Sequence, residues 1–316
     1  MALTKFGLML GAALIGLPLA VANAGPHDSI SSDGSEAGSV GPVGRMSPSY
    51  QGTSKGSEAL GVEDALASGK GGVMSAEGMA LLEIAKPMIG PGSGESVIGP
   101  DGRRRIGTTT KFPYRAIAMI LFNGGYLCTG WFISPNTVAT AGHCVYDPGV
   151  GFYPTGSYTI YPGANGSATP YGSCNATRLS TVKGWANSGR DDYDYGAIKL
   201  DCTVGNTVGW FGFFWTRGTL NNLPAFITGY PGDKSLGTMW RSKGRIKVTQ
   251  PRRVFYPNDT AGGMSGSPVY YKRRSCGWCS MAVHAYGTGG GYPYNSYNHG
   301  TRINKAVFKN LKKWKN

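Results

Sequence analysis

The chain has 316 residues, of which 41% are hydrophobic, so it can bury one large or two small cores and is not a disordered tail. Its formal net charge is +14 at pH 7, and its six cysteines all lie beyond residue 100. After residue 24 no apolar run is long enough to cross a bilayer, which excludes a protein with several spanning helices.

Residues 1–24 have the features of a secretory signal peptide. Lys5 supplies the positive start, Leu8 to Ala20 forms the apolar run, and Ala22-Asn23-Ala24 offers the small residues of a cleavage site. The alternative is a membrane anchor, but the run is shorter than the roughly 20 residues that a spanning helix needs. We therefore expect a secreted, extracellular protein without a membrane partner, whose cysteines form three disulfides.

Residues 25–95 differ in texture from the rest of the chain. They are rich in Gly, Ser and Ala, contain no cysteine, and carry nine acidic against four basic side chains. Only Met79 to Lys86 has enough apolar residues to predict a short helix, which Pro87 would stop. Because this segment can hardly bury a core of its own, it is either a linker or a prosegment removed on maturation.

From Ser96 onward the sequence changes to short β-branched and aromatic runs separated by Gly, Pro and Asn. Many short strands with almost no helical periodicity predict an all-β antiparallel sandwich or barrel. At the C-terminus, Val307, Phe308, Leu311 and Trp314 instead recur at helical spacing and predict an amphipathic helix packed on the domain. The predicted strands are Ala116 to Phe122, Tyr158 to Tyr161, Ala197 to Leu200, Ala225 to Thr228, Arg245 to Thr249, Pro268 to Tyr271 and Met281 to His284.

The stretch Gly262-Gly263-Met264-Ser265-Gly266-Ser267-Pro268 holds a serine among glycines. Such a turn can expose one hydroxyl and aim two backbone N–H groups at the same point, as an acyl-transfer nucleophile requires. Gly-Ser runs are also ordinary loop sequence. The assignment therefore depends on a histidine base and an orienting carboxylate elsewhere in the chain.

Four histidines make the search for a base short. His27 lies in the segment before residue 96, and His299 lies in a Tyr/Asn/Gly loop, where we expect a surface role. His143 stands in Thr140-Ala-Gly-His-Cys144, after the strand-like run from Trp131 to Ala139. Small neighbours there let an imidazole lie at a barrel edge, which makes His143 the candidate base.

The candidate carboxylate is Asp194, which opens the apolar run Asp194-Tyr-Gly-Ala-Ile-Lys-Leu200. At the mouth of a strand it would be partly buried and accept a hydrogen bond from the histidine Nδ1–H. Asp191 and Asp192 are expected to be solvated loop charges. The resulting order of His143, Asp194 and Ser265 is the order found in chymotrypsin-like peptidases.

Three motifs together resemble that class: Thr-Ala-Gly-His-Cys, Asp-Tyr-Gly-Ala-Ile-Lys-Leu and Gly-Gly-Met-Ser-Gly-Ser-Pro. With Ser96-Val-Ile-Gly99, Thr228-Gly-Tyr-Pro-Gly-Asp-Lys234 and Ala282-Val-His284, residues 96–316 look like the secreted bacterial glutamyl endopeptidases. The resemblance implies two antiparallel six-stranded β-barrels with the site between them. It also implies protein or peptide substrates and neither metal nor organic cofactor, and we expect a monomer.

By role, the resemblance makes Ser265 the nucleophile, His143 the general base and Asp194 the residue that holds the imidazole. The N–H groups of Gly263 and Ser265 would form the oxyanion hole. Met264 departs from the class, because chymotrypsin-like zymogens place there an aspartate that pairs with the freed N-terminus. A thioether cannot form that ion pair, so this activation mechanism is excluded.

Two features give opposite predictions about the bond that is cut. Asp259 lies six residues before Ser265, where trypsin-like enzymes keep the carboxylate that binds Lys or Arg. However, all eight acidic residues from Ser96 to Asn316 are aspartates, whereas residues 25–95 contain six glutamates. A protease that cuts after Glu would be protected from itself by this composition. The last glutamate, Glu95, immediately precedes Ser96, so self-processing there is our hypothesis.

The resemblance places Thr260 and His284 in the primary specificity pocket, where both would hydrogen-bond a substrate carboxylate. A protonated His284 would favour glutamate and make binding sensitive to pH. The resemblance also places the α-amino group of a mature Ser96 near this pocket. A trypsin-like peptidase that uses Asp259 remains the alternative specificity.

Residues 96–316 carry 26 basic against 8 acidic side chains, so an acidic prosegment would dock on them electrostatically. This charge also suits nucleic acid, and a secreted basic binding module with an inactive site is a further alternative. No aromatic-basic recognition motif supports nucleic-acid binding, which we do not expect. We expect disulfides between Cys128 and Cys144, between Cys276 and Cys279 and, by elimination, between Cys174 and Cys202.

Overall fold

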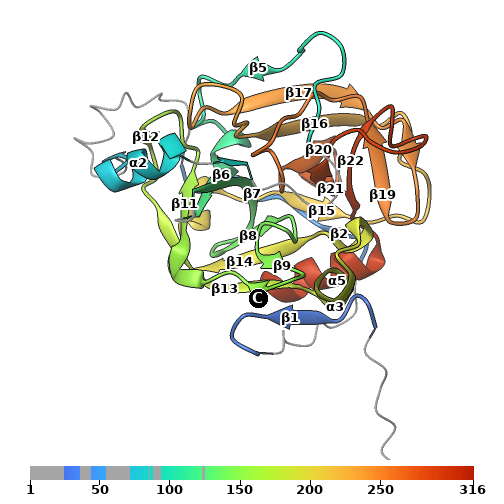
Figure 1. Ribbon diagram of the computed structural model, residues 1–316, viewed down its shortest axis with the longest axis horizontal. Coiled ribbons are helices and arrows are strands. Elements are labelled where there is room, and N and C mark those ends of the chain that lie inside the picture. The colour runs from blue at the N-terminus through green and yellow to red at the C-terminus, as the bar shows by residue number, and fades with distance from the viewer. Residues whose placement is uncertain (1–24, 36–43, 55–71, 85, 88–93, 123–124) are drawn as a thin grey trace, which may run out of the picture.

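The computed structural model describes residues 25–35, 44–54, 72–84, 86–87, 94–122 and 125–316 (Figure 1). The predicted signal peptide, residues 1–24, lies outside the described residues. Two curled β-sheets lie side by side, with the C-terminal helix against the first of them (Figure 1). Among the described residues, no helix combines the length and the apolar character that crossing a membrane requires.

The first sheet closes into a barrel of six strands in the order β13-β11-β6-β7-β8-β14, because β14 also pairs with β13. All these pairings are antiparallel, and residues 117–121 of β6 are buried along their whole length. The strands are β6 (Ile117–Phe122), β7 (Tyr126–Ser134), β8 (Thr137–Thr140), β11 (Tyr158–Pro162), β13 (Cys174–Val182) and β14 (Gly196–Leu200).

The second sheet is a curled half-barrel in the order β18-β19-β22-β21-β20-β16-β17-β5, and β15 runs parallel to β21. Its core contains Ile227, Val254 and Met264. The strands are β5 (Arg104–Arg105), β15 (Gly212–Phe214), β16 (Pro224–Gly229), β17 (Trp240–Arg245), β18 (Val248–Thr249), β19 (Arg253–Tyr256), β20 (Pro268–Arg273), β21 (Gly277–Tyr286) and β22 (Asn298–Arg302). The predicted all-β, chymotrypsin-like class is thus confirmed.

The predicted C-terminal helix is also confirmed. It is α5 (Lys305–Trp314), and Asn304 caps it by accepting the N–H groups of Ala306 and Val307 through its side chain. The four apolar residues that predicted it are all buried. The remaining short elements are α3 (Lys183–Ser188), α4 (Gly205–Val208), η1 (Tyr114–Ala116), η2 (Thr155–Ser157), η3 (Asp191–Tyr193), β9 (Tyr146–Asp147), β10 (Gly151–Phe152) and β12 (Ala168–Thr169).

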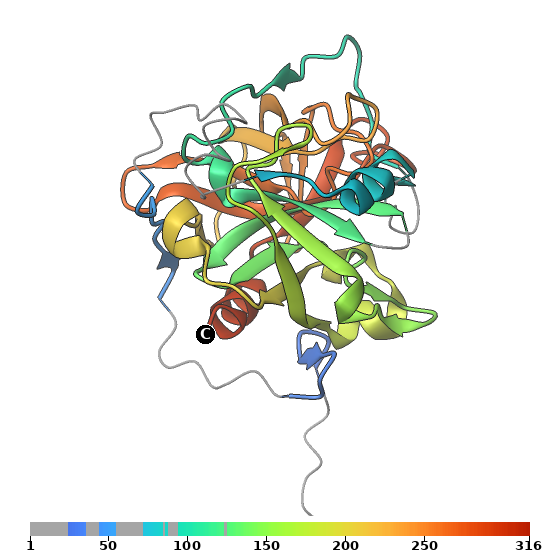
Figure 2. The ribbon, with the colours of Figure 1, turned by 90° about the vertical axis from the view of Figure 1, so that its left-hand side faces the viewer.

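The segment before residue 96 contributes four short strands: two join the first sheet, one joins the second, and one pairs with β12 in a separate two-stranded sheet. β1 (Ser29–Ser31) pairs with β13, β2 (Met46–Ser47) with β15, β3 (Gly72–Val73) with β12, and β4 (Lys86–Pro87) with β7. The helix predicted at Met79 to Lys86 is α2 (Ala76–Ile84), which lies against the closed barrel and buries Leu82 (Figure 2). These backbone pairings, together with an ion pair between Asp33 and Arg178, hold the described part of this segment against the sheets.

All three predicted disulfides are present: Cys128–Cys144, Cys174–Cys202 and Cys276–Cys279. Cys128–Cys144 ties β7 to the loop that carries His143. Cys276–Cys279 closes the turn between β20 and β21 as a local cross-link. The groups of described side chains close enough to hold a metal each contain a disulfide's two cysteines, which offer no thiolate.

Candidate active site

His143 and Asp194 meet through two hydrogen bonds. Asp194 Oδ2 lies 2.7 Å from His143 Nδ1, and Asp194 Oδ1 accepts the backbone N–H of His143 at 2.9 Å. Burial by itself would raise the pKa of Asp194, but the adjacent His143 and the hydrogen bonds outweigh it and hold that pKa below its ordinary value. Asp194 is therefore a buried carboxylate that orients the imidazole.

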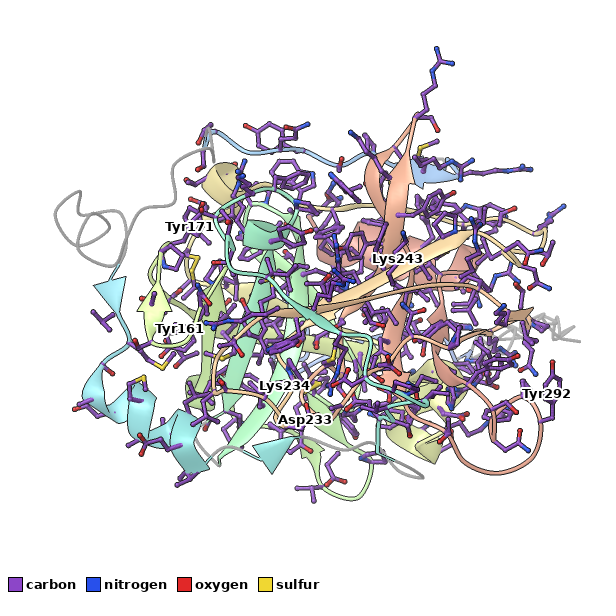
Figure 3. All side chains as sticks on the ribbon, turned by 90° about the horizontal axis from the view of Figure 1, so that it is seen from above. Tyr161, Tyr171, Asp233, Lys234, Lys243 and Tyr292 are labelled. Atoms are coloured by element: carbon purple, nitrogen blue, oxygen red, sulfur yellow. A yellow bond between two sulfur atoms is a disulfide. The ribbon has the colours of Figure 1, made fainter. Side chains whose placement is uncertain are left out.

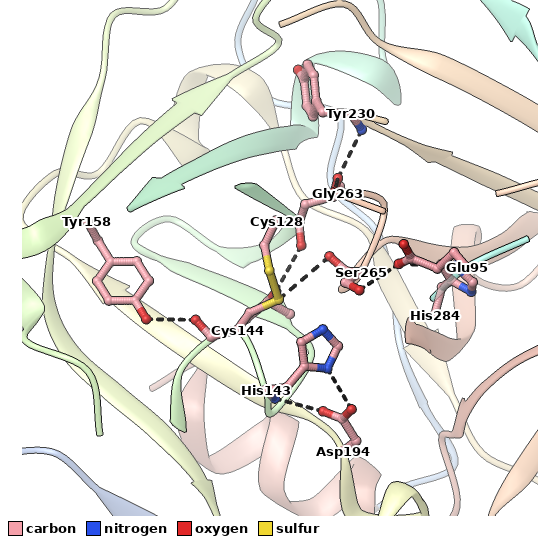
Figure 4. Close-up of a disulfide and its surroundings, with 12 residues drawn as sticks. Glu95, Cys128, His143, Cys144, Tyr158, Asp194, Tyr230, Gly263, Ser265 and His284 are labelled. Atoms are coloured by element: carbon pink, nitrogen blue, oxygen red, sulfur yellow. Dashed lines mark hydrogen bonds and ion pairs between the residues drawn. A yellow bond between two sulfur atoms is a disulfide. The ribbon is translucent and has the colours of Figure 1, made fainter. Parts of the chain in front are cut away.

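Figure 4 shows the imidazole of His143 lying between Asp194 and Ser265. Ser265 stands in the turn that precedes β20. Gly263 and Gly266 on either side of it have φ of 97° and 88°, a region that favours glycine. The predicted triad residues thus come from the junction between η3 and β14, the loop after β8 and this turn.

The turn that carries Ser265 is fastened to the first barrel by Thr129 of β7. Its hydroxyl donates to the carbonyl oxygen of Gly263 at 2.8 Å, and its N–H donates to the carbonyl oxygen of Ser265 at 2.9 Å. The same hydroxyl accepts the N–H of Tyr230 at 3.0 Å. One buried threonine therefore sets the position of the serine turn against the barrel that holds the histidine.

The side chain of Glu95 contacts Ser265 directly. Ser265 Oγ donates to Glu95 Oε1 at 2.6 Å, and the backbone N–H of Ser265 also bonds to this carboxyl group (Figure 4). Burial raises the pKa of Glu95 to about 8. Sequence reasoning identified Glu95 as a cleavage position but missed this contact. No local pattern could have revealed it, because the two residues are 170 positions apart.

His284 lies on the other side of this carboxyl group, with its Nε2 3.6 Å from Glu95 Oε1. Its Nδ1 is 2.7 Å from the hydroxyl of Tyr256. Burial, helped by repulsion from His143, lowers the pKa of His284 to about 3. In this form of the chain the ring is therefore neutral at pH 7 and would offer Nε2–H as a hydrogen-bond donor.

Thr260 is also buried, and it contacts Ser96, the residue after Glu95. Its backbone N–H donates to the carbonyl oxygen of Ser96 at 3.1 Å, and among the described residues its hydroxyl has no hydrogen-bond partner. Ser96 is held further by Asn298, whose Oδ1 accepts the Ser96 N–H at 3.2 Å. Thr260 therefore contacts Ser96, while His284 faces the side chain of the preceding residue, Glu95.

Asp259 does not point toward a substrate. Its Oδ1 accepts the N–H of Ile98 and its Oδ2 accepts the N–H of Gly102, both at 2.8 Å. Both carboxylate oxygens are thus used to hold the segment that follows Ser96. This geometry disfavours the reading of Asp259 as the carboxylate that binds Lys or Arg, because both oxygens already accept backbone N–H groups and spacing along the chain does not determine the direction of a side chain.

The same segment is anchored a second time through Arg103, whose side chain is fully buried. Arg103 Nη2 pairs with Asp101 at 2.9 Å and with Asp233 at 2.5 Å, and Lys234 Nζ pairs with Asp101 at 2.7 Å. Asp233 and Lys234 lie next to one another at this edge (Figure 3). The Gly-Tyr-Pro-Gly-Asp-Lys motif thus helps to hold the residues that lead away from Ser96.

Two expectations for polar residues near the site are wrong. His299 is buried rather than at the surface, and its Nδ1 lies 2.7 Å from Arg253 Nη1. Asp191 and Asp192 remain partly exposed, but they are not free loop charges, because both form ion pairs with the fully buried side chain of Arg253. The sequence offered no signal for this cluster, since Arg253 is about 60 residues from its acidic partners.

Met264 is fully buried in the core of the second sheet, and its N–H donates to the carbonyl oxygen of Ala261. An apolar residue fits this position because a charged one would be buried there without solvent.

Comparisons with known proteins agree with this fold. Residues 105–307 match the family model described as Trypsin. The chain is 44% identical to a glutamyl endopeptidase of Bacillus licheniformis, over 99% of this chain and 97% of that protein. It is 39% identical to a Bacillus subtilis protein named extracellular metalloprotease, over 99% and 95%. A solved structure of a Glu endopeptidase in complex with MPD, 34% identical, superimposes with a TM-score of 0.61 and covers 69% of this chain and 99% of that one.

Proposed function

Because the chain belongs to the trypsin family of chymotrypsin-like serine peptidases and is a serine endopeptidase, we propose that it is secreted and cuts after Glu, and less readily after Asp. Support for the specificity comes from the relative named glutamyl endopeptidase and from the site itself. The match to an extracellular relative of nearly equal length supports secretion, with residues 1–24 as the signal peptide.

In the proposed reaction, the Ser265 hydroxyl attacks the scissile carbonyl carbon while His143 takes its proton. His143 then returns that proton to the leaving amine, and water hydrolyses the acyl-enzyme. Asp194 holds the imidazole, and the N–H groups of Gly263 and Ser265 stabilise the oxyanion. Loss of one such donor costs about 3 kcal/mol of transition-state stabilisation.

The observation that supports the proposed specificity most directly is the position of the Glu95 side chain. The site accommodates a buried glutamate carboxyl group between Ser265 and His284, although burying such a group is costly unless it is hydrogen-bonded. The buried hydroxyl of Thr260, which has no hydrogen-bond partner among the described residues, is a second polar group available to a substrate. A substrate glutamate would place its carboxylate toward His284 and Thr260, and its carbonyl carbon at Ser265.

We further propose that residues 25–95 are a prosegment and that cleavage after Glu95 produces the mature domain, residues 96–316. In the uncut chain, Ser265 bonds the side chain of Glu95 and not a scissile carbonyl. This arrangement favours a latent precursor. Hydrolysis of the peptide bond between Glu95 and Ser96 would let the side chain of Glu95 leave with the prosegment. It would also create the α-amino group of Ser96 nearby, so a basic group would replace an acidic one beside the site.

The two alternatives have less support. A trypsin-like pocket needs a carboxylate free to meet Lys or Arg, whereas Asp259 is occupied by Ile98 and Gly102. A catalytically inactive binding module would not need the short bonds between His143 and a fully buried Asp194.

A panel of peptides that differ only in the residue before the cut tests this function. We expect the processed enzyme to cut after Glu, more slowly after Asp, far more slowly after Gln, and not after Lys or Arg. Ser265→Ala should abolish hydrolysis. Cleavage after Lys or Arg in preference to Glu would overturn the specificity, and hydrolysis that survives Ser265→Ala would overturn the role of the serine. Sequencing the mature N-terminus tests the maturation site, and a start well away from Ser96 would contradict it.

A further inference from the structure

Tyr286, the last residue of β21, makes a contact that the sequence did not predict. Its hydroxyl donates to Asp194 Oδ2 at 2.5 Å, and the same oxygen lies 2.7 Å from His143 Nδ1. Both Tyr286 and Asp194 are buried. We propose that Tyr286 is a positioning residue for the reaction, whose hydroxyl holds the Asp194 carboxylate so that His143 keeps its orientation and tautomer. This inference rests on the proposed roles of His143, Asp194 and Ser265.

The hydroxyl of Tyr286 acts as a donor. Burial, the negative charge of Asp194 and the hydrogen bond to it raise the pKa of Tyr286 well above its ordinary value. The phenol therefore keeps its proton at neutral pH and supplies it to the carboxylate. A buried carboxylate needs such donors, because without them the charged form is strongly destabilised. Asp194 thus receives three hydrogen bonds, two from His143 and one from Tyr286.

Two side chains, those of His299 and Arg253, pack against the ring of Tyr286. It stacks on His299, with ring centroids 5.2 Å apart and planes inclined by 25°, and the guanidinium of Arg253 lies 5.6 Å from its centroid. Arg253 is held in turn by its ion pairs with Asp191 and Asp192. Burial and the charge of Arg253 lower the pKa of His299 to about 2, so its ring is neutral and its Nδ1 accepts from Arg253.

The pairing of β21 with β22 is irregular between His284 and Tyr286. Bulges of this kind next to active sites re-aim side chains. Here the irregularity separates the residue that faces the Glu95 carboxyl group from the residue that supports Asp194. One strand therefore contributes to both the specificity pocket and the support of the histidine.

The test compares Tyr286→Phe with the parent in the mature enzyme. Phenylalanine keeps the ring and its stacking but removes the donor. We expect kcat to fall about tenfold while KM stays unchanged, because a hydrogen bond to a charged group is lost away from the substrate. The acid limb of the kcat/KM profile should move to higher pH, since a carboxylate with one donor fewer favours the protonated imidazole.

The charged and titratable groups around this contact are shared by variant and parent, so they do not cause the expected shift. They are His143, Asp194, Arg253, Asp191, Asp192, His299 and His284. Tyr294→Phe is the matched control. This tyrosine also packs against His299 and Arg253, but the described contacts of its ring do not include Asp194. It should leave both kcat and the acid limb unchanged.

An unchanged kcat together with an unchanged acid limb in Tyr286→Phe would overturn the proposal. Should that variant fail to fold, His299→Gln removes the stacked ring while keeping an acceptor for Arg253. It should shift the acid limb in the same direction, and an unmoved limb would be equally decisive. Each kcat of a variant is divided by the kcat of the parent on a peptide that the parent cuts. A wrong glutamyl specificity would show in which peptides the parent cuts, whereas a wrong role of Tyr286 would show as a ratio near one.

Discussion

The carboxylate of Asp259 accepts the backbone N–H of Ile98 at 2.8 Å, three residues after the junction between Glu95 and Ser96. Its other oxygen accepts the N–H of Gly102 at the same distance. Asp259 thus holds the beginning of the proposed mature domain beside the pocket. Its contribution to specificity is therefore indirect, through the position of Ser96.

Asp259→Asn should weaken cleavage after Glu without affecting any cleavage after Lys or Arg. The amide can accept from one N–H but presents its own donor to the other, so the segment after Ser96 loosens and KM rises. We expect kcat/KM for a Glu peptide to fall about tenfold. Asp201→Asn is the control, because Asp201 also accepts a backbone N–H, from Asn175, at an exposed position. A loss of Lys or Arg cleavage in Asp259→Asn would restore the trypsin-like reading.

The contact between Glu95 and Ser265 should make the precursor sensitive to pH. The pKa of Glu95 is about 8 in the folded precursor and 4.5 ordinarily, so the folded chain binds more protons than the unfolded chain between these values. The stability that this group contributes is therefore present at low pH and is lost as pH rises through 8. Labelling of Ser265 by a fluorophosphonate should accelerate from pH 6 to 9 more in the wild-type precursor than in Glu95→Gln, which does not titrate.

Glu95→Ala offers a second comparison with Glu95→Gln, since neither variant has a glutamate at the junction. Alanine uncovers the serine, whereas glutamine keeps a neutral side chain that can accept from it. We expect the alanine precursor to be labelled at least about tenfold faster, because it lacks a hydrogen bond and a buried side chain on the nucleophile. Equal labelling rates of the two precursors would show that Glu95 does not cover Ser265.

His284→Gln should reduce cleavage after Glu selectively. In the proposed pocket a neutral His284 would donate Nε2–H to the substrate carboxylate, and a hydrogen bond to a charged group contributes about 1.5 to 3 kcal/mol. We expect kcat/KM for a Glu peptide to fall by about ten- to a hundredfold. A peptide with Gln before the cut serves as the internal control, because its neutral side chain gains less from this donor. A parallel loss on both peptides would place His284 outside the specificity pocket.

Thr129→Val should lower kcat as well as stability. The substitution leaves the carbonyl oxygen of Gly263 and the N–H of Tyr230 without their partner, at a cost of about 1 to 3 kcal/mol in unfolding free energy. The serine turn would then shift against the histidine. Thr137→Val is the matched control, since this buried hydroxyl donates to the carbonyl oxygen of Trp314, far along the chain from the site. It should lose stability but keep kcat.

Several features follow from local sequence alone. The C-terminal helix could be predicted because its apolar residues recur at the spacing of one helix face, and the strands because β-branched and aromatic residues cluster between turn residues. The strand predicted from Arg245 to Thr249 is in fact divided between β17 and β18. His143, Asp194 and Ser265 could be chosen because each stands in a short motif whose neighbours reveal its role, and all three lie together in the fold (Figure 4).

The tertiary structure decided which way the polar side chains point and what they meet. Asp259 turns toward backbone N–H groups, and Asp191, Asp192 and His299 gather around a buried Arg253, because burying that charge requires partners. The contacts of Glu95 with Ser265 and of Tyr286 with Asp194 join residues 170 and 92 positions apart. Chemistry carried by short motifs was therefore readable from the sequence, whereas contacts that depend on burial and on the packing of distant strands appear only in the folded chain.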